Sequence, residues 1–177
     1  MPFAAVIYFN EQTEKTIRDI WKSLNSPLLA PAMDEKGIRP HLTLAIYDQL
    51  ECCSCQKALG YLKKQIHTIN LNFTYFGIFH YSNPIVFMAP PLEKQLKNIH
   101  EQIHDCLQKR GSGPWEIYLH DNWVPHCTLA MDFNKEQLPA VMERCLQLSL
   151  PIKTPAVQIG IVEFDPIQPV FEIDLPS

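Results

Sequence analysis

A six-residue segment occurs twice in this chain, and its repetition limits the possible folds more than any other feature. Pro-His-Leu-Thr-Leu-Ala occupies residues 40–45 and Pro-His-Cys-Thr-Leu-Ala occupies residues 125–130. The two histidines, His41 and His126, are therefore 85 positions apart. A fold built on this repeat must contain the same local structure twice.

Shorter matches occur at similar spacing. Two pairs of dipeptides recur at offsets of 83 and 84: Gly77-Ile78 with Gly160-Ile161, and Val86-Phe87 with Val170-Phe171. The agreement of the three offsets predicts an internal duplication. We expect a single catalytic domain over residues 1–177, made of repeats at roughly 1–82 and 83–177, with the N- and C-terminal strands able to share a lobe.

Apolar periodicity gives both halves the order strand, helix, motif strand, helix, strand, with one strand left over at the C-terminal end. The strands are expected at 4–9, 41–47, 71–79, 85–89, 126–131, 157–164 and 170–175. A further short strand is expected around 115–119. Asn134 is a predicted N-cap, with Gln137 as its capping-box partner.

Composition narrows the class of protein. The 177 residues are 46% hydrophobic and 19% charged, which is typical of a globular domain. A net charge of -4 without a dense basic run argues against a long track for duplex nucleic acid. No apolar stretch approaches the roughly 20 residues needed to span a bilayer, so we expect a cytoplasmic protein. We also expect its six cysteines to be reduced and the protein to be a monomer.

The repeated segment carries side chains suited to acid–base chemistry. In a strand, alternate residues share a face, so His41, Thr43, Ala45 and Tyr47 are expected to point one way. Two copies related by approximate two-fold symmetry would bring two imidazoles and two hydroxyls to one cleft. One histidine could then accept a proton while the other donates one, and the threonines could bind phosphate oxygens.

With these motifs the chain resembles the two-histidine phosphoesterase superfamily, and most of all its bacterial branch of RNA 2′,3′-cyclic phosphodiesterases, or 2′-5′ RNA ligase-like proteins. The resemblance implies an α+β fold: two pseudo-symmetric lobes of antiparallel sheets, helices on the outer faces and a central cleft. It also implies no metal or other cofactor, opening of a cyclic phosphate on a nucleotide or RNA end, and His41, Thr43, His126 and Thr128 as the functional residues.

Three residues near the motifs are candidates for substrate binding. Arg39 could hold phosphate, Tyr47 could stack on a base, and Trp123 could do the same from the loop that enters the second motif. For each, a structural role is an open alternative. The expected partner is a nucleotide or short RNA with a cyclic phosphate.

Other functions stay open at this stage. Joining of RNA ends through a 2′-5′ bond would use the same groups, and the same fold could form a nucleotide-binding module without catalysis. His100-Glu101-Gln102-Ile103-His104 also matches the H-E-x-x-H pattern of zinc hydrolases. The helical pattern, however, predicts that His100 and His104 lie at the solvent edge of their helix, so the zinc site is the least favoured reading.

Overall fold

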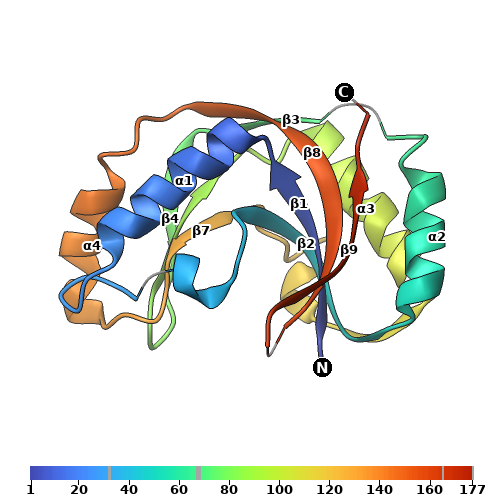
Figure 1. Ribbon diagram of the computed structural model, residues 1–177, viewed down its shortest axis with the longest axis horizontal. Coiled ribbons are helices and arrows are strands. Elements are labelled where there is room, and N and C mark those ends of the chain that lie inside the picture. Colours follow the sequence, from blue (N-terminus) through green and yellow to red (C-terminus); the bar gives the residue numbers. More distant parts are fainter. Residues whose placement is uncertain (32, 67–68, 165, 177) are drawn as a thin grey trace.

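Two antiparallel sheets and the helices that cover them make up the chain (Figure 1). The computed structural model describes residues 1–31, 33–66, 69–164 and 166–176. Its strands are β1 (Phe3–Phe9), β2 (His41–Leu50), β3 (Asn70–Phe73), β4 (Tyr75–Phe79), β5 (Ile85–Ala89), β6 (Gly111–Pro114), β7 (Cys127–Ala130), β8 (Ile152–Glu163) and β9 (Gln168–Asp174). Its α-helices are α1 (Glu11–Leu24), α2 (Cys52–Leu62), α3 (Lys94–Leu107) and α4 (Leu138–Cys145), with short 3-10 helices η1 (Asp34–Lys36), η2 (Glu116–Tyr118) and η3 (Lys135–Gln137). The predicted α+β fold is confirmed.

The two sheets contain the same three-stranded unit. The larger sheet runs β3-β8-β1-β2-β6, with β9 also paired to β8, and the smaller runs β4-β5-β7. In the first, Val6 pairs with Gly160 on one side and Thr43 on the other. In the second, Phe87 pairs with Gly77 and Thr128. The unit β8-β1-β2 is therefore the counterpart of β4-β5-β7, as the duplication predicts.

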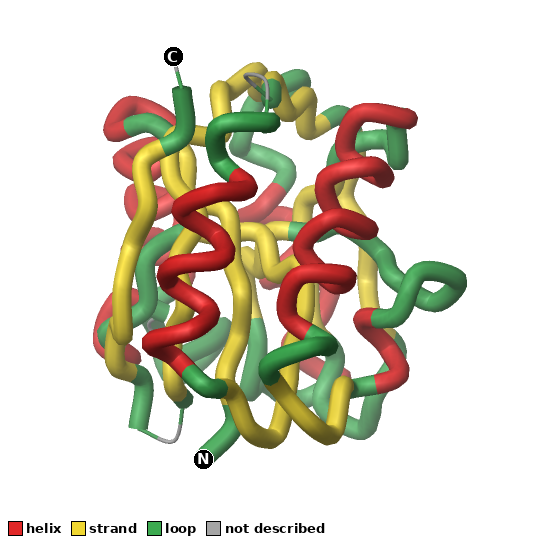
Figure 2. Tube along the Cα trace, turned by 90° about the vertical axis from the view of Figure 1, so that its right-hand side faces the viewer, coloured by secondary structure: helices red, strands yellow, loops and turns green. Residues whose placement is uncertain are grey.

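Each sheet combines strands from both halves of the sequence. β8 comes from the second half but completes the sheet of β1 and β2, and β4 comes from the first half but completes that of β5 and β7. The helices are exchanged in the same way, because α1 packs on β7 and α4, while α3 packs on β2 and α2. Figure 1 shows α1 and α4 on one side and α2 and α3 on the other, and Figure 2 shows two helices side by side in front of the strands.

Each motif strand contains a β-bulge directly after its threonine. Across β1 and β2 the pairing passes from Val6–Thr43 to Ala5–Ala45, so Leu44 is an extra residue. The same shift occurs between β5 and β7, where the residue after Thr128 is left over. A bulge changes which side chains face which side of the sheet. Both Leu44 and Ala45 are consequently buried.

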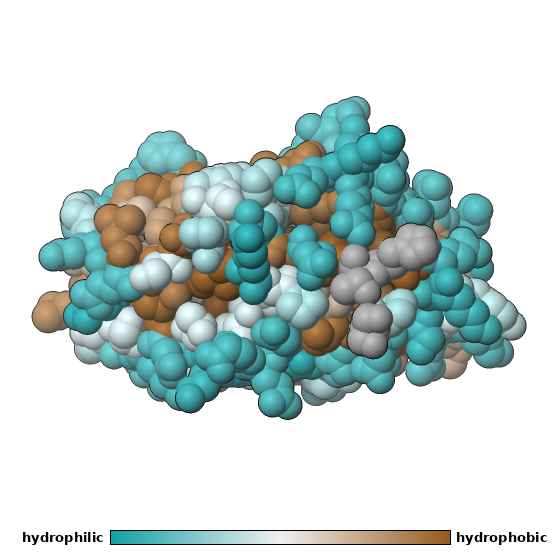
Figure 3. Space-filling model, turned by 90° about the horizontal axis from the view of Figure 1, so that it is seen from above, coloured by the Kyte–Doolittle hydropathy of each residue, from teal (hydrophilic) through white to brown (hydrophobic). Residues whose placement is uncertain are grey.

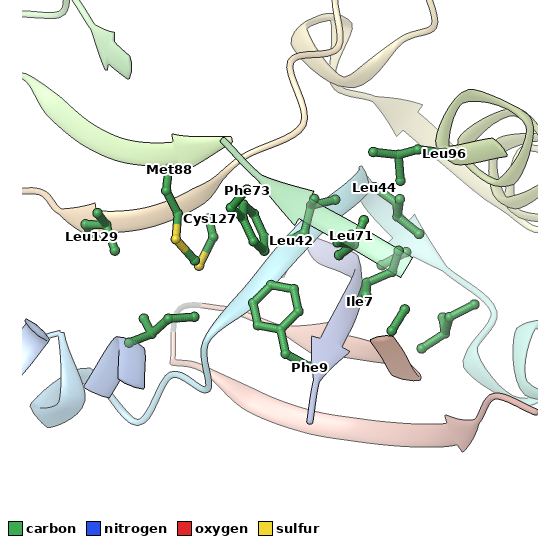
Figure 4. Close-up of a cluster of buried hydrophobic side chains, with 14 of the residues drawn as sticks. Ile7, Phe9, Leu42, Leu44, Leu71, Phe73, Met88, Leu96, Cys127 and Leu129 are labelled. Carbon is green, nitrogen blue, oxygen red and sulfur yellow. The ribbon is translucent and has the colours of Figure 1, made fainter. Parts of the chain in front are cut away.

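One hydrophobic core joins the two sheets. Figure 4 shows Phe9, Leu42 and Phe73 from the larger sheet close to Met88 and Cys127 from the smaller one. The strand β1 is buried on both faces, with alternate side chains in this core and in a smaller cluster formed by Ala4, Val6, Tyr8 and Ile46. Burial on both faces explains why β1 reads as a continuous apolar run instead of an alternating one.

Some local predictions were wrong. Residues 71–79 form two strands in different sheets, and residues 116–118 form a 3-10 helix instead of a strand. Val170 and Phe171 lie in β9, which pairs with β8, so they are not the structural counterpart of Val86 and Phe87. At residue 74 the chain leaves one sheet and enters the other. The apolar pattern continues unbroken through this position, so the sequence does not reveal the break.

The predicted capping box between Asn134 and Gln137 is confirmed. The six cysteines are unpaired in the structure. Figure 3 shows the molecule from above, and on this face hydrophilic side chains surround hydrophobic ones that lie along the middle. Among the described residues no helix is both long and apolar enough to span a membrane.

The glycines at equivalent positions of the two sheets should be intolerant of a side chain. A Cβ atom at Gly77 would overlap the ring of Phe87, and one at Gly160 would overlap the ring of Tyr8. We expect Gly77→Ala and Gly160→Ala each to lower the free energy of unfolding by about 1–3 kcal/mol, measured by urea denaturation. Gly60→Ala in α2 is the control, because a Cβ there meets nothing within 4 Å. Its expected effect is a gain of up to about 1 kcal/mol.

Candidate active site

The two motif histidines make the same hydrogen bond in the two lobes. Nδ1 of His41 lies 2.7 Å from the carbonyl oxygen of Arg39, and Nδ1 of His126 lies 2.7 Å from that of Val124. A carbonyl can only accept, so Nδ1 of each ring must carry the proton. Nε2 of each neutral imidazole is then left as a base, and Nε2 of each imidazolium as an acid.

Both histidines are partly buried, and His41 senses the charge of His126. Burial lowers the pKa of His41 below its usual 6.5, the Arg39 carbonyl opposes this shift, and a charge on His126 lowers the pKa further. Burial also lowers the pKa of His126, against the effect of its bond to Val124. The main chain of His41 also contacts the Cys127 thiol, which joins β2 to β7. The structure thus brings the two motifs together.

Each histidine borders its own pocket. The first pocket holds about 260 Å³ and is lined by both motif side chains of β2, His41 and Thr43. Most of its remaining wall is apolar, and the residues are Ala4, Val6, Tyr8, Gly37, Ile38, Arg39, Ile46, Val162, Phe164, Ile167, Pro169 and Glu172. This pocket is large enough for a nucleobase and part of a sugar.

The second pocket is aromatic. It holds about 190 Å³ and is lined by His126 together with Phe79, Tyr81, Ile85, Ile117, Tyr118, Asn122 and Val124. The His126 ring lies edge-on to Phe79, with ring centroids 4.8 Å apart, and 5.3 Å from the centroid of Phe87. Aromatic side chains therefore pack against the His126 ring at the edge of this pocket.

Tyr118 lines the second pocket and packs against residues of the first, and no feature of the sequence marked it as a site residue. Its ring lines the pocket of His126, and its side chain lies near that of Thr43, which lines the first pocket. Burial and the nearby Tyr81 raise the pKa of Tyr118 to about 12, so its hydroxyl is protonated at neutral pH. Tyr118 ends η2, and the 3-10 helix at the corresponding place in the first half, η1, contains no tyrosine, so the repeat does not mark it.

Arg39 reaches the first pocket, but its charge is already paired. Its guanidinium donates to Glu14 and Glu172, each at 2.7 Å, and lies 3.9 Å from the ring centroid of Tyr8. Among the described residues that line the two pockets, Arg39 is the one arginine and no lysine occurs. A phosphate here would be bound chiefly by histidine and hydroxyl groups.

Tyr47 lies in the core, on the opposite side of β2 from His41. The bulge at Leu44 reverses the alternation, so Ile46 faces the first pocket while Tyr47 is 1% exposed. The Tyr47 hydroxyl contacts Nδ1 of His104 at 3.3 Å. The prediction that Tyr47 shares the face of His41 was wrong, because the sequence does not reveal the extra residue.

Trp123 is also buried, beneath the site. Its indole N–H donates to the carbonyl of Thr43 at 2.9 Å, and its ring stacks on His100 with centroids 3.9 Å apart. The exposed fraction of its side chain is 5%, so its ring offers no face for a base. Its contact with the motif is structural support.

The histidines of the H-E-x-x-H segment are buried, not at the solvent edge as predicted. Nε2 of His100 donates to the Tyr118 carbonyl at 2.9 Å, and Nε2 of His104 to the Leu44 carbonyl at 3.2 Å. Nδ1 of His100 contacts Nδ1 of His120 at 3.3 Å. The loop that carries His120 and Trp123 covers this side of α3, which the helical pattern alone could not show.

These contacts do not fit a zinc site. Each ring of the pair has both nitrogens engaged in hydrogen bonds. Glu101 lies partly exposed beside Lys97, with 4.0 Å between their charged atoms, and is not aimed at the histidines. Within the part of the chain that the structure describes, no three His, Cys, Asp or Glu side chains are grouped so as to hold a metal ion.

The fold and the paired motifs define the class of two-histidine phosphoesterases, and comparison with known proteins agrees. A family model described as the 2′-5′ RNA ligase superfamily matches residues 55–166. The chain belongs to this superfamily. Comparison with curated protein sequences gave no match.

Solved structures show the same fold over the whole chain. LigT of E. coli complexed with 3′-AMP superposes with a TM-score of 0.65 at 16% identity, covering 100% of both chains. A structure described as a phosphoesterase gives 0.60 at 15% identity, covering 99% of both. Usb1 of Kluyveromyces marxianus with uridine monophosphate gives 0.51 at 10% identity, covering 99% of this chain and 98% of that one.

The buried histidines predict that acid weakens the fold. Burial, and then the neighbouring His104, lower the pKa of His100 from 6.5 to about 4. Between pH 6.5 and 4, His100 is protonated in the unfolded chain and neutral in the folded one. Lowering the pH therefore favours the unfolded chain, and the free energy of unfolding should fall by roughly 2–3 kcal/mol across this range. Urea denaturation across this range should give a shallower decline for His100→Gln than for the wild type and for exposed His80→Gln. An unchanged decline in His100→Gln would contradict the assignment.

Proposed function

We propose that this protein is a metal-independent phosphoesterase that hydrolyses the 2′,3′-cyclic phosphate of a nucleotide or an RNA end. The observation that carries the proposal is the pair of imidazoles with identical Nδ1–carbonyl hydrogen bonds, His41 and His126, in adjoining pockets. Membership of the 2′-5′ RNA ligase superfamily supports the same class of reaction. Each ring keeps Nε2 for proton transfer, and together they supply the base and the acid that opening a diester requires.

The reaction follows from these groups. Nε2 of the neutral histidine takes a proton from water as the water oxygen bonds to phosphorus. The bond from phosphorus to one ribose oxygen breaks, and Nε2 of the protonated histidine donates a proton to that oxygen. The hydroxyls of Thr43 and Thr128 donate to the non-bridging oxygens, where negative charge increases in the transition state. The product is a phosphate monoester, and the two histidines have exchanged protonation states.

The pockets suit a substrate with an organic group beside the phosphate. The apolar pocket of about 260 Å³ next to His41 can take a nucleoside, and the aromatic pocket next to His126 can stack a second ring. LigT with 3′-AMP and Usb1 with uridine monophosphate are related structures with nucleotides bound. A nucleotide or short RNA fits this site better than a long duplex. The proposal includes RNA processing in the cytoplasm by a monomer.

Two other functions would use the same site. Formation of a 2′-5′ bond is the reverse of diester cleavage and needs the same acid and base. A nucleotide-binding module without turnover would use the same pockets but would not need Nε2 for proton transfer. Such a module would bind nucleotides in calorimetry and form no product from any cyclic phosphate.

Removing either histidine should abolish turnover. We expect His41→Ala and His126→Ala each to lower kcat on 2′,3′-cyclic mononucleotides by about 10²–10⁴-fold, and Thr43→Ala and Thr128→Ala by about 10²-fold, with EDTA present throughout. His80→Ala, which removes an exposed histidine outside both pockets, is the control and should match the wild type. Full activity of either motif-histidine variant would exclude the mechanism. Turnover that is lost with EDTA and restored by added metal would contradict the metal-independent mechanism.

Activity should be highest on the acidic side of pH 6.5. The pKa values of His41 and His126 are both lowered, by burial first. The reactive form has one of the two protonated, and this form is most populated between the two apparent pKa values of the pair. We expect a bell-shaped profile of kcat/KM with its maximum below pH 6.5. A maximum above pH 7.5 would contradict the assignment of these histidines as acid and base.

A further inference from the structure

The main-chain carbonyls of the two motif threonines, Thr43 and Thr128, share a feature that the proposed chemistry does not use. The indole N–H of Trp123 donates to the carbonyl of Thr43 at 2.9 Å, and that of Trp21 donates to the carbonyl of Thr128 at 3.1 Å. Both carbonyls stand at the bulges, where the hydrogen bonding between strands is locally interrupted. A tryptophan side chain thus serves the same main-chain atom in each lobe.

The two tryptophans are not copies of one another. Trp21 lies near the end of α1, and Trp123 lies in the connection between η2 and the second motif. The 85-residue spacing that relates the histidines does not relate them. The duplication therefore does not account for the matching hydrogen bonds. Two unrelated positions meet the same structural need at equivalent places.

Neither ring can touch the substrate. The exposed fractions of Trp21 and Trp123 are 2% and 5%, and neither lines the pockets. Trp21 is held by the packing of α1 on β7, and Trp123 by its stacking on His100. Any effect of these rings on catalysis must act through the threonines.

We infer that Trp21 and Trp123 are positioning residues that hold the hydroxyls of Thr128 and Thr43 on target by fixing their main-chain carbonyls. A hydrogen bond to the carbonyl fixes the orientation of the peptide plane after the threonine, and so limits rotation of the bulge. A donor that stabilises a transition state is effective only when its direction is set beforehand. The inference rests on the proposed phosphoesterase activity.

Replacing each indole by a benzene ring tests the bond. Phenylalanine keeps the aromatic packing and lacks the N–H. For Trp21→Phe and Trp123→Phe we expect kcat to fall about five- to twentyfold, the loss of one directed hydrogen bond, with KM within about twofold. Trp115→Phe is the control, because Trp115 is 38% exposed and its indole bonds Asp48 instead of a site threonine. Its kcat should match the wild type, and unchanged kcat in both test variants would overturn the inference.

Crossed variants separate positioning from general destabilisation. In a Thr43→Val background, Trp123→Phe should cause no further loss of kcat, whereas Trp21→Phe should cause its full loss. In a Thr128→Val background, Trp21→Phe should cause no further loss of kcat, and Trp123→Phe should cause its full loss. Equal losses in both backgrounds would mean that the tryptophans only stabilise the fold. Should either phenylalanine variant not fold, benzothienylalanine at the same position keeps the bicyclic ring without the N–H.

A second measurement distinguishes failure of this inference from failure of the proposed function. If the wild type turns over no cyclic phosphate, the proposed function is wrong, and amide hydrogen exchange then tests the bonds alone. Trp123→Phe should speed exchange at residues 43–45 only, Trp21→Phe at residues 128–130 only, and Trp115→Phe at neither. Exchange that is unchanged, or faster across the whole sheet, would overturn the inference.

Discussion

One additional residue in each motif strand is the constraint on which the site and the core both depend. Before the bulge, His41 and Thr43 point into a pocket, as the alternation of a strand requires. After it, the phase is reversed and Tyr47 enters the core. A regular strand would have placed a tyrosine in the pocket and Ile46 in the core. The bulge lets one short strand carry polar chemistry at one end and core packing at the other.

The site is nearly free of fixed positive charge. The arginine at its edge is neutralised by Glu14 and Glu172, and burial favours the uncharged form of both histidines. A phosphate entering such a pocket would itself supply the negative charge that draws a proton onto one imidazole. One of the two rings thus becomes protonated when the phosphate binds. The carbonyls at Nδ1 leave Nε2 as the nitrogen that transfers the proton.

The repeated segment identified the fold and the four candidate residues, because both depend on residue type and spacing. The sequence could not show features that depend on tertiary contacts. The bulges add a residue without changing composition, so Tyr47 was placed on the wrong face. The histidines of α3 were predicted at the surface because the loop that buries them lies some twenty residues further on. Tyr118 and the two indole donors lie outside the motifs, and the corresponding positions of the other half carry no tyrosine or tryptophan.

The exchange of strands and helices between the lobes has an evolutionary consequence. A lone ancestral repeat would have presented β1 and β2 without the neighbour that β8 now provides, leaving an open edge and an uncovered face. Two such chains could complete one another by exchanging their first helix and the strand that corresponds to β4 and β8. Gene fusion of an intertwined homodimer gives this topology directly. The two halves of the present chain are therefore interlocked, and neither can drift or be deleted as an independent module.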